Sequence, residues 1–144
     1  MARIRLLPAV CCLALAGFAS AQSGYFQTLV KEAKSRIREI DVSQFQALRS
    51  QTPAPVVVDV REDNEWNQSR IPGAIHVGRG VLEPAIETKV PEKSAAVIVY
   101  CRSGGRSAVA ADVLQKMGYT NVRSLAGGIT AYQAAGLPVE QGSR

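Results

Sequence analysis

Residues 96–107 read Ala-Val-Ile-Val-Tyr-Cys-Arg-Ser-Gly-Gly-Arg-Ser, and this stretch decides the fold. Its first five residues form a continuous apolar run, largely β-branched, which is typical of a parallel strand buried on both faces. Residues 108–117 then place apolar side chains at positions 110, 113, 114 and 117, which is the spacing of one buried helical face. The stretch predicts a strand, a glycine-bearing turn and a helix, with Cys101 at the carboxyl end of the strand.

The predicted turn surrounds Cys101 with groups that favour negative charge. Backbone N–H groups at a helix N-terminus attract anions. Two arginines in the turn add positive charge, which favours the nucleophilic thiolate form of the cysteine. We therefore expect a thiolate that faces a cradle of the size of a small anion. The residues of this cradle are Arg102, Ser103, Gly104, Gly105 and Arg106.

The first residues have the pattern of an export signal. Arg3 and Arg5 form a basic start, and residues 6–19 form an apolar run that is too short to span a bilayer comfortably. Ala19-Ser20-Ala21 then matches the small-x-small pattern of a cleavage site. We predict a signal peptide at residues 1–21 and an exported protein, periplasmic or secreted, with no stable membrane span after cleavage. The alternative is that the segment is kept as an anchor.

The cysteines support a reactive thiol. Two of the three lie within the predicted signal, so the processed protein would keep only Cys101. A lone cysteine forms no internal disulfide, and in an exported protein it is a candidate reactive thiol. The alternative is that Cys101 is a small buried hydrophobic residue. The polar, glycine-rich turn that follows favours the reactive thiol.

Charge and metal ligands exclude other classes of function. The chain holds 17 Lys+Arg and 12 Asp+Glu, a formal charge of +5, and loss of residues 1–21 would leave 15 basic against 12 acidic residues. This mild excess, without a dense basic stripe, argues against a nucleic-acid partner. The chain has one histidine, His76, and a structural metal site needs about four ligands, so we expect no metal and no cofactor.

Strands alternate with helices along the rest of the chain. The expected strands are residues 38–41, 55–61, 74–77, 96–100 and 121–125. The expected helices are residues 22–38, 43–50, 62–69, 81–90, 108–117 and 129–135. This alternation predicts an α/β fold in which a central, mostly parallel sheet of about five strands has helices on both faces. Ligands of such sheets bind beyond the carboxyl ends of the strands, where Cys101 lies.

Four polar residues outside the cradle have predicted roles. Asp59 and Arg61 end a strand of valines and are either catalytic or a structural ion pair, and we favour the pair because buried charges are kept when they are paired. His76 has no acidic residue close in sequence to orient it, so we do not expect it to act as a base for Cys101. Ser107 is expected to be the N-cap of the helix that follows the cradle.

Three motifs in this order resemble the single-domain rhodaneses, a family of sulfurtransferases. They are Asp59-Val60-Arg61-Glu62 with Ile71-Pro72-Gly73-Ala74, the loop Cys101–Ser107, and Leu125-Ala126-Gly127-Gly128-Ile129 through Gly136-Leu137-Pro138. The resemblance covers residues 38–140, which would form one rhodanese-like, three-layer domain between an N-terminal helical extension at residues 22–37 and a tail at residues 141–144. One departure is Ser69-Arg70, where the family often has Gly-His.

The resemblance implies a function and a set of roles. Cys101 would carry sulfur as a persulfide, and Arg102 and Arg106, with the loop amides, would bind the sulfonate part of a donor such as thiosulfate. The acceptor would be cyanide, a thiol or sulfite, and the thiol could belong to a protein. We expect a monomer or a weak dimer.

Two other functions stay open. Cysteine phosphatases and arsenate reductases use a longer Cys-x5-Arg loop, and here Ser107 stands where that arginine would be. The loop length therefore favours sulfur transfer over these activities. The second alternative is a carrier or binding module that relays sulfur to a partner without multiple turnover.

Overall fold

The computed structural model describes residues 24–142, and the predicted signal peptide lies outside these residues. Five strands form one sheet in the order β1-β6-β5-β2-β4, and every pair of neighbours is parallel. Their bounds are β1 Arg38–Ile40, β2 Val56–Asp59, β4 Ile75–His76, β5 Val97–Tyr100 and β6 Val122–Leu125. Two short strands, β3 Ser69–Arg70 and β7 Glu140–Gln141, form a separate antiparallel pair.

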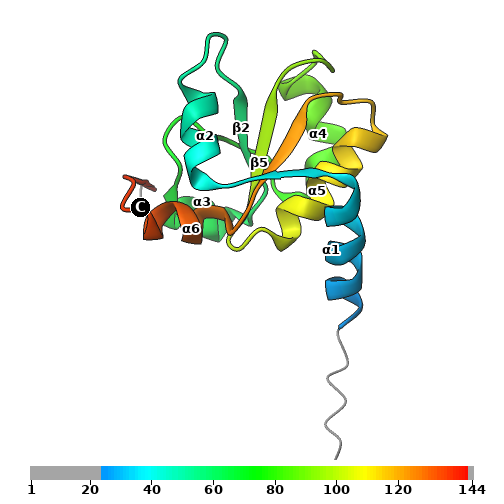
Figure 1. The fold of residues 1–144 in the computed structure, drawn as a ribbon, viewed down its shortest axis with the longest axis horizontal. Coiled ribbons are helices and arrows are strands. Elements are labelled where there is room, and N and C mark those ends of the chain that lie inside the picture. The colour runs from blue at the N-terminus through cyan, green and yellow to red at the C-terminus, as the bar shows by residue number, and fades with distance from the viewer. Residues whose placement is uncertain (1–23, 143–144) are drawn as a thin grey trace, which may run out of the picture.

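Helices cover both faces of the sheet (Figure 1). Helices α4 and α5, with the preceding turn η1, pack on one face, and α2 and α6 pack on the other. The bounds of the helices are α1 Tyr25–Arg36, α2 Val42–Arg49, α3 Asp63–Gln68, η1 Arg79–Val81, α4 Leu82–Lys89, α5 Gly105–Lys116 and α6 Gly128–Ala134. The predicted α/β architecture, with a five-stranded parallel sheet between two helical layers, is confirmed.

The central strand β5 shows why the sheet has a core on each side. All four of its residues are buried, and successive side chains of a strand point to opposite faces. Val97 and Val99 therefore join the cluster beneath α4 and α5, while Ile98 and Tyr100 join the cluster beneath α2 and α6. This double burial is the reason that the strand is apolar throughout.

Two helix starts differ from the predicted ones. Helix α2 begins at Val42, one residue before the expected start, and Asp41 is its N-cap. The Asp41 carboxylate accepts from the Gln44 backbone N–H at 2.8 Å, and the Gln44 side chain accepts from the Asp41 N–H at 3.0 Å. Helix α5 begins at Gly105, three residues earlier than expected, because Gly104 takes a left-handed conformation (φ +96°) and turns the chain directly into the helix.

Strand β2 ends earlier than the predicted segment 55–61. The Asp59 carboxylate accepts a hydrogen bond from the backbone N–H of Arg61 at 2.9 Å. The strand ends at Asp59, although Val60 still donates its N–H to the Tyr100 carbonyl at 3.0 Å, and the bond to the Arg61 N–H turns the chain after that point. Within residues 24–142, none of the helices has both the length and the apolar content that a membrane crossing requires.

Candidate active site around Cys101

Cys101 directly follows β5 and is buried, with 1% of its surface exposed. Its Sγ accepts a hydrogen bond from the backbone N–H of Gly104 at 3.2 Å. Gly104 must be a glycine for two reasons, since its φ is +96° and a Cβ there would lie 3.1 Å from the Gly127 nitrogen. The turn therefore folds back over the sulfur and aims a backbone donor at it.

The start of α6 holds the backbone of the same loop. Ile129 donates its N–H to the Cys101 carbonyl at 2.9 Å, and Thr130 donates to the Arg102 carbonyl at 3.1 Å. Gly128 allows this close approach, because a Cβ at this position would collide with the Cys101 carbonyl oxygen. The glycine pair of the third sequence motif thus positions the nucleophile, a role that the sequence pattern alone did not assign.

Ser107 lies inside α5 and is not its N-cap, which corrects the sequence expectation. The N-cap is Gly104, and it has no side chain to bond the helix amides. The Ser107 hydroxyl instead donates to the Gly104 carbonyl at 3.2 Å and accepts from the Ser124 hydroxyl at 2.9 Å. Both serines are fully buried, so they join the catalytic turn to β6 through a polar contact inside the core.

Arg106 is engaged by a carboxylate that the sequence analysis missed. Its Nη1 lies 2.6 Å from Glu65 Oε2, and its Nη2 lies 2.8 Å from Glu65 Oε1. The hydrogen bonds from Arg106 lower the pKa of Glu65 to about 2, and pairing with Glu65 raises the pKa of Arg106. Glu65 belongs to α3, and no local pattern in the sequence links it to the loop.

Two hollows flank the loop. On one side, a polar hollow of about 290 Å³ contains Arg102. The other residues that line it are Arg61, Glu65, Gln68, Ser69, Ile129 and Gln133. Within the described residues, the exposed side chain of Arg102 has no hydrogen-bond or ion-pair partner, so this cation is free for an anion. On the other side, Ser103 and Gly105 border a groove of about 450 Å³ against α1.

Asp59 and Arg61 form a buried ion pair. The guanidinium meets the carboxylate at 2.6–3.0 Å and also donates to the Ser69 carbonyl at 2.6 Å. The exposed fractions of the two residues are 0% and 4%, and neither residue contacts Cys101 through a hydrogen bond. The pair ties the end of β2 to the end of α3, and so it holds the helix that carries Glu65.

Tyr100 links the loop to a second part of the chain. Burial raises the pKa of Tyr100 above its usual range, so its hydroxyl is neutral. That hydroxyl accepts a hydrogen bond from the Ile71 backbone N–H at 3.1 Å. The Ile71–Ala74 turn of the first motif is therefore attached to the residue that precedes Cys101.

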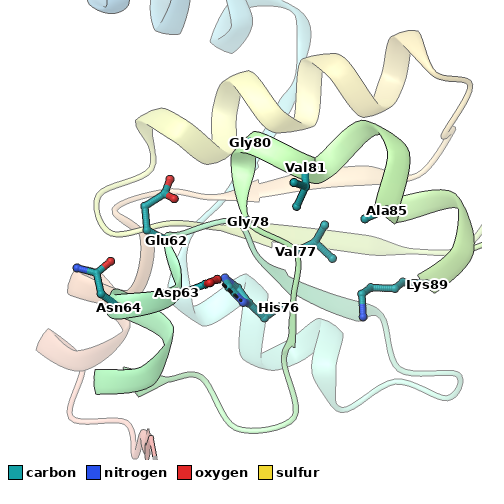
Figure 2. A pocket seen from close by; sticks show the side chains of 10 residues that line it. All are labelled: Glu62, Asp63, Asn64, His76, Val77, Gly78, Gly80, Val81, Ala85 and Lys89. Atoms are coloured by element: carbon teal, nitrogen blue, oxygen red, sulfur yellow. Dashed lines mark ion pairs between the residues drawn. The ribbon is translucent and has the colours of Figure 1, made fainter.

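His76 lies away from the loop, in the hollow of about 590 Å³ shown in Figure 2. Its Nε2 lies 2.8 Å from the Arg61 carbonyl, its Nδ1 lies 3.6 Å from Asp63, and its ring stacks on Trp66 at 5.0 Å. None of the loop residues 101–106 lines this hollow. The histidine thus supports the chain after β2 and has no geometric relation to the sulfur. Across residues 24–142, no three side chains of His, Cys, Asp or Glu gather as metal ligands would.

A buried cysteine at the carboxyl end of a parallel strand, beside a helix start and two arginines, makes Cys101 a candidate nucleophile. Residues 41–135 match the model of the rhodanese-like domain, and the chain belongs to this family.

Related proteins agree with this assignment. A sulfurtransferase of Allochromatium vinosum is 35% identical over 103 residues, covering 72% of this chain and 94% of its own. A thiosulfate sulfurtransferase of Escherichia coli is 39% identical over 70 residues, covering 49% of this chain and 67% of its own. A solved structure from Rhodopseudomonas palustris, described as a protein of unknown function and possible tyrosine phosphatase, superposes with a TM-score of 0.73 at 30% identity. That match covers 86% of this chain and all of the other.

Proposed function

We propose that the protein is a sulfurtransferase that moves a sulfane sulfur from a donor such as thiosulfate to a thiophilic acceptor through a persulfide on Cys101. The observation that carries the proposal is the hydrogen bond from the Gly104 N–H to the Cys101 Sγ in a loop of only four residues between Cys101 and Arg106. A loop this short aims a backbone donor directly at the sulfur of Cys101. Its donors stabilise negative charge on that sulfur.

In the first half-reaction, the Cys101 thiolate attacks the outer sulfur of thiosulfate. A bond forms between the Cys101 Sγ and that sulfur, the sulfur–sulfur bond of thiosulfate breaks, and sulfite leaves with the electron pair. Arg102 is the free cation at the loop, so it holds the anionic end of the donor. Attack by a thiolate needs no general base, and His76 lies in a hollow that none of residues 101–106 lines.

In the second half-reaction, an acceptor nucleophile attacks the outer sulfur of the persulfide. The bond between this sulfur and the Cys101 Sγ breaks, and the Cys101 thiolate is restored. The Gly104 N–H then stabilises the restored thiolate by donating a hydrogen bond to the Cys101 Sγ. The two steps form a double displacement in which donor and acceptor use the loop in turn.

The ion pair of Arg106 favours sulfur over phosphorus. A phosphatase needs its loop arginine free to bind the dianionic phosphoryl group during transfer. Here the Glu65 carboxylate occupies both terminal nitrogens of Arg106 and would itself repel a phosphoryl group. This observation supports sulfur transfer over the phosphatase or arsenate reductase alternative.

Mass spectrometry of the protein after treatment with thiosulfate tests the proposal. We expect a gain of about 32 Da, the mass of one sulfur, on the peptide that contains Cys101. The variant Cys101→Ser should show no gain and should form no thiocyanate from thiosulfate and cyanide. Thiocyanate formation by this variant, or hydrolysis of a phosphate ester by the wild type without sulfur uptake, would overturn the proposal. Many thiocyanate molecules per protein indicate an enzyme, and a single one indicates a relay.

We further propose that the protein is exported, on the pattern of residues 1–21. The same mass measurement, made on protein recovered from cells, tests this point. Cleavage should yield a chain that begins at Gln22, and recovery of the complete chain from the cytoplasm would contradict it.

A further inference from the structure

Helix α1 lies outside the segment that matches the family model, and it stands beside the catalytic loop. Its C-terminal part is fastened to α5, since Ala33 is buried and Arg36 forms an ion pair with Asp112 at 2.8 and 3.0 Å. Its N-terminal half projects past the rest of the domain in Figure 1. The position of α1 is thus fixed at one end, while its first two turns leave a face open.

That open face is apolar. Tyr25, Phe26 and Leu29 are 81%, 52% and 40% exposed. The other large hydrophobic side chain with high exposure within residues 24–142 is Val81, which lies on η1. Exposure of three neighbouring apolar side chains is costly in water and is typical of a binding surface.

The apolar face continues into the catalytic loop. One groove of about 450 Å³ has Phe26 and Val30 on one wall and Ser103 and Gly105 on the other. The Phe26 ring and a Val30 methyl group lie 3.5 Å from the point where a Cβ of Gly105 would be. A molecule that covers this face therefore reaches the loop that holds Cys101. We call this surface, formed by Phe26, Gln27, Val30, Lys31, Lys34, Ser103 and Gly105, the α1 groove.

The groove has a positive rim. Lys31 and Lys34 line it, and no carboxylate does. Lys34 forms an ion pair with Glu39, with 2.9 Å between its Nζ and the Glu39 Oε1. Lys31 is in no ion pair formed among residues 24–142. The occupant that matches this surface has apolar side chains with acidic ones around them. Thiosulfate, cyanide and sulfite have no apolar surface, so the groove is not needed for them.

We propose that the α1 groove docks a protein acceptor whose reactive cysteine is surrounded by apolar and acidic residues, and this proposal rests on the proposed sulfurtransferase function. The acceptor thiolate attacks the outer sulfur of the Cys101 persulfide. A bond forms between the acceptor sulfur and the outer sulfur, the bond to the Cys101 Sγ breaks, and the Cys101 thiolate leaves. The transferred sulfur keeps the negative charge that it carried in the persulfide, and there is no net oxidation or reduction.

The experiment measures sulfur transfer from protein that is first loaded with thiosulfate and then freed of it. The acceptors are free cysteine and two synthetic peptides, each with one cysteine flanked by leucines, one peptide carrying aspartates and the other lysines. We expect the acidic peptide to react about fivefold faster than the basic one at low salt and the difference to shrink as salt is added. Lys31→Glu should reverse the preference, and Phe26→Asp, at an apolar residue that lines the groove, should slow both peptides relative to free cysteine. Lys89→Glu, an equal charge change on α4, is the matched control and should leave the preference intact.

Three results would overturn the proposal. The first is equal rates for the two peptides, or a preference that Lys31→Glu does not change. The second is a wild-type dimer that Phe26→Asp converts to a monomer, because the groove would then bind a second copy. The third is binding of the wild-type protein to anionic phospholipid vesicles, if Lys31→Glu and Phe26→Asp both abolish this binding but leave the rates of sulfur transfer to the two peptides unchanged. The loading step tests the proposed function separately. If the protein takes up no sulfur from thiosulfate, the sulfurtransferase function is refuted before any peptide is added.

Discussion

Arg106 and Glu65 are 41 residues apart in the chain, yet they form a two-bonded ion pair at 2.6 and 2.8 Å beside the catalytic loop. The pair joins α3 to α5 and removes one of the two loop arginines from the set of free cations. Arg102 is then the residue best placed to attract a donor. Arg106 thus stabilises the position of α3 against α5, while Arg102 lines the polar hollow beside the loop.

Arg102→Ala should raise the KM for thiosulfate by roughly 10- to 100-fold, because a charge-assisted hydrogen bond is worth about 1.5–3 kcal/mol. Steady-state kinetics with cyanide as acceptor measure this change. Arg102→Lys keeps the charge and should recover most of the donor affinity. An unchanged KM in the alanine variant would show that another group holds the donor.

Glu65→Gln should make the protein less sensitive to acid. The folded-state pKa of Glu65 is about 2, below its ordinary value of 4.5, so the unfolded chain binds more protons between these values. The ion pair therefore stabilises the fold above about pH 4.5, and this contribution falls as the pH drops towards 2. Urea unfolding at pH 6 and pH 3 should show a stability gap between wild type and variant that narrows at the lower pH.

Asp63→Asn is the control for that experiment, since Asp63 lies on the same helix with 92% of its side chain exposed. It should leave the slope of stability against pH nearly unchanged. A gap between wild type and Glu65→Gln that is equal at both pH values would contradict the assigned role of the ion pair.

Ser107→Ala should destabilise the protein by about 1–3 kcal/mol, because the buried Ser124 hydroxyl would lose its acceptor. Denaturant unfolding measures the cost. The double variant Ser107→Ala with Ser124→Ala removes both hydroxyls and should cost less than the sum of the single variants. Strict additivity would mean that the two serines do not depend on each other.

Gly128→Ala should disrupt the loop, because the new Cβ would collide with the Cys101 carbonyl and the backbone has φ +57°. Loss of persulfide formation, together with a fall in melting temperature, is the expected result. Gly136→Ala is a matched control, since Gly136 also has a positive φ (+74°) but no atom lies within 4 Å of its Cβ position. It should cost about 1 kcal/mol and leave persulfide formation intact. Equal effects of the two changes would rule out the predicted collision.

The sequence by itself determined the layers and the position of the nucleophile. The apolar run before Cys101 and the helical spacing after it are local patterns, and local backbone preferences follow from them directly. The alternation of strands and helices then left a parallel sheet as the simplest way to bury every apolar face. Gly118, two residues after the end of α5, has a φ of +93°, the left-handed conformation that favours glycine just beyond a helix.

Apart from the Asp59–Arg61 pair, which the sequence favoured, the polar contacts around the loop depend on the tertiary structure. Helix α2 was expected to begin at residue 43, and the reciprocal bonds between Asp41 and Gln44 place its N-cap at Asp41. The choice of Glu65 as the partner of Arg106 depends on where α3 and α5 lie, and the contact of Gly128 with Cys101 depends on where α6 begins. Side-chain pairs of this kind are set by the distance between elements in space, and no periodicity along the chain encodes that distance. The residues around Cys101 were therefore visible in the sequence, while the pairing of Arg106 with Glu65, which leaves Arg102 without a partner among residues 24–142, appeared only in the folded protein.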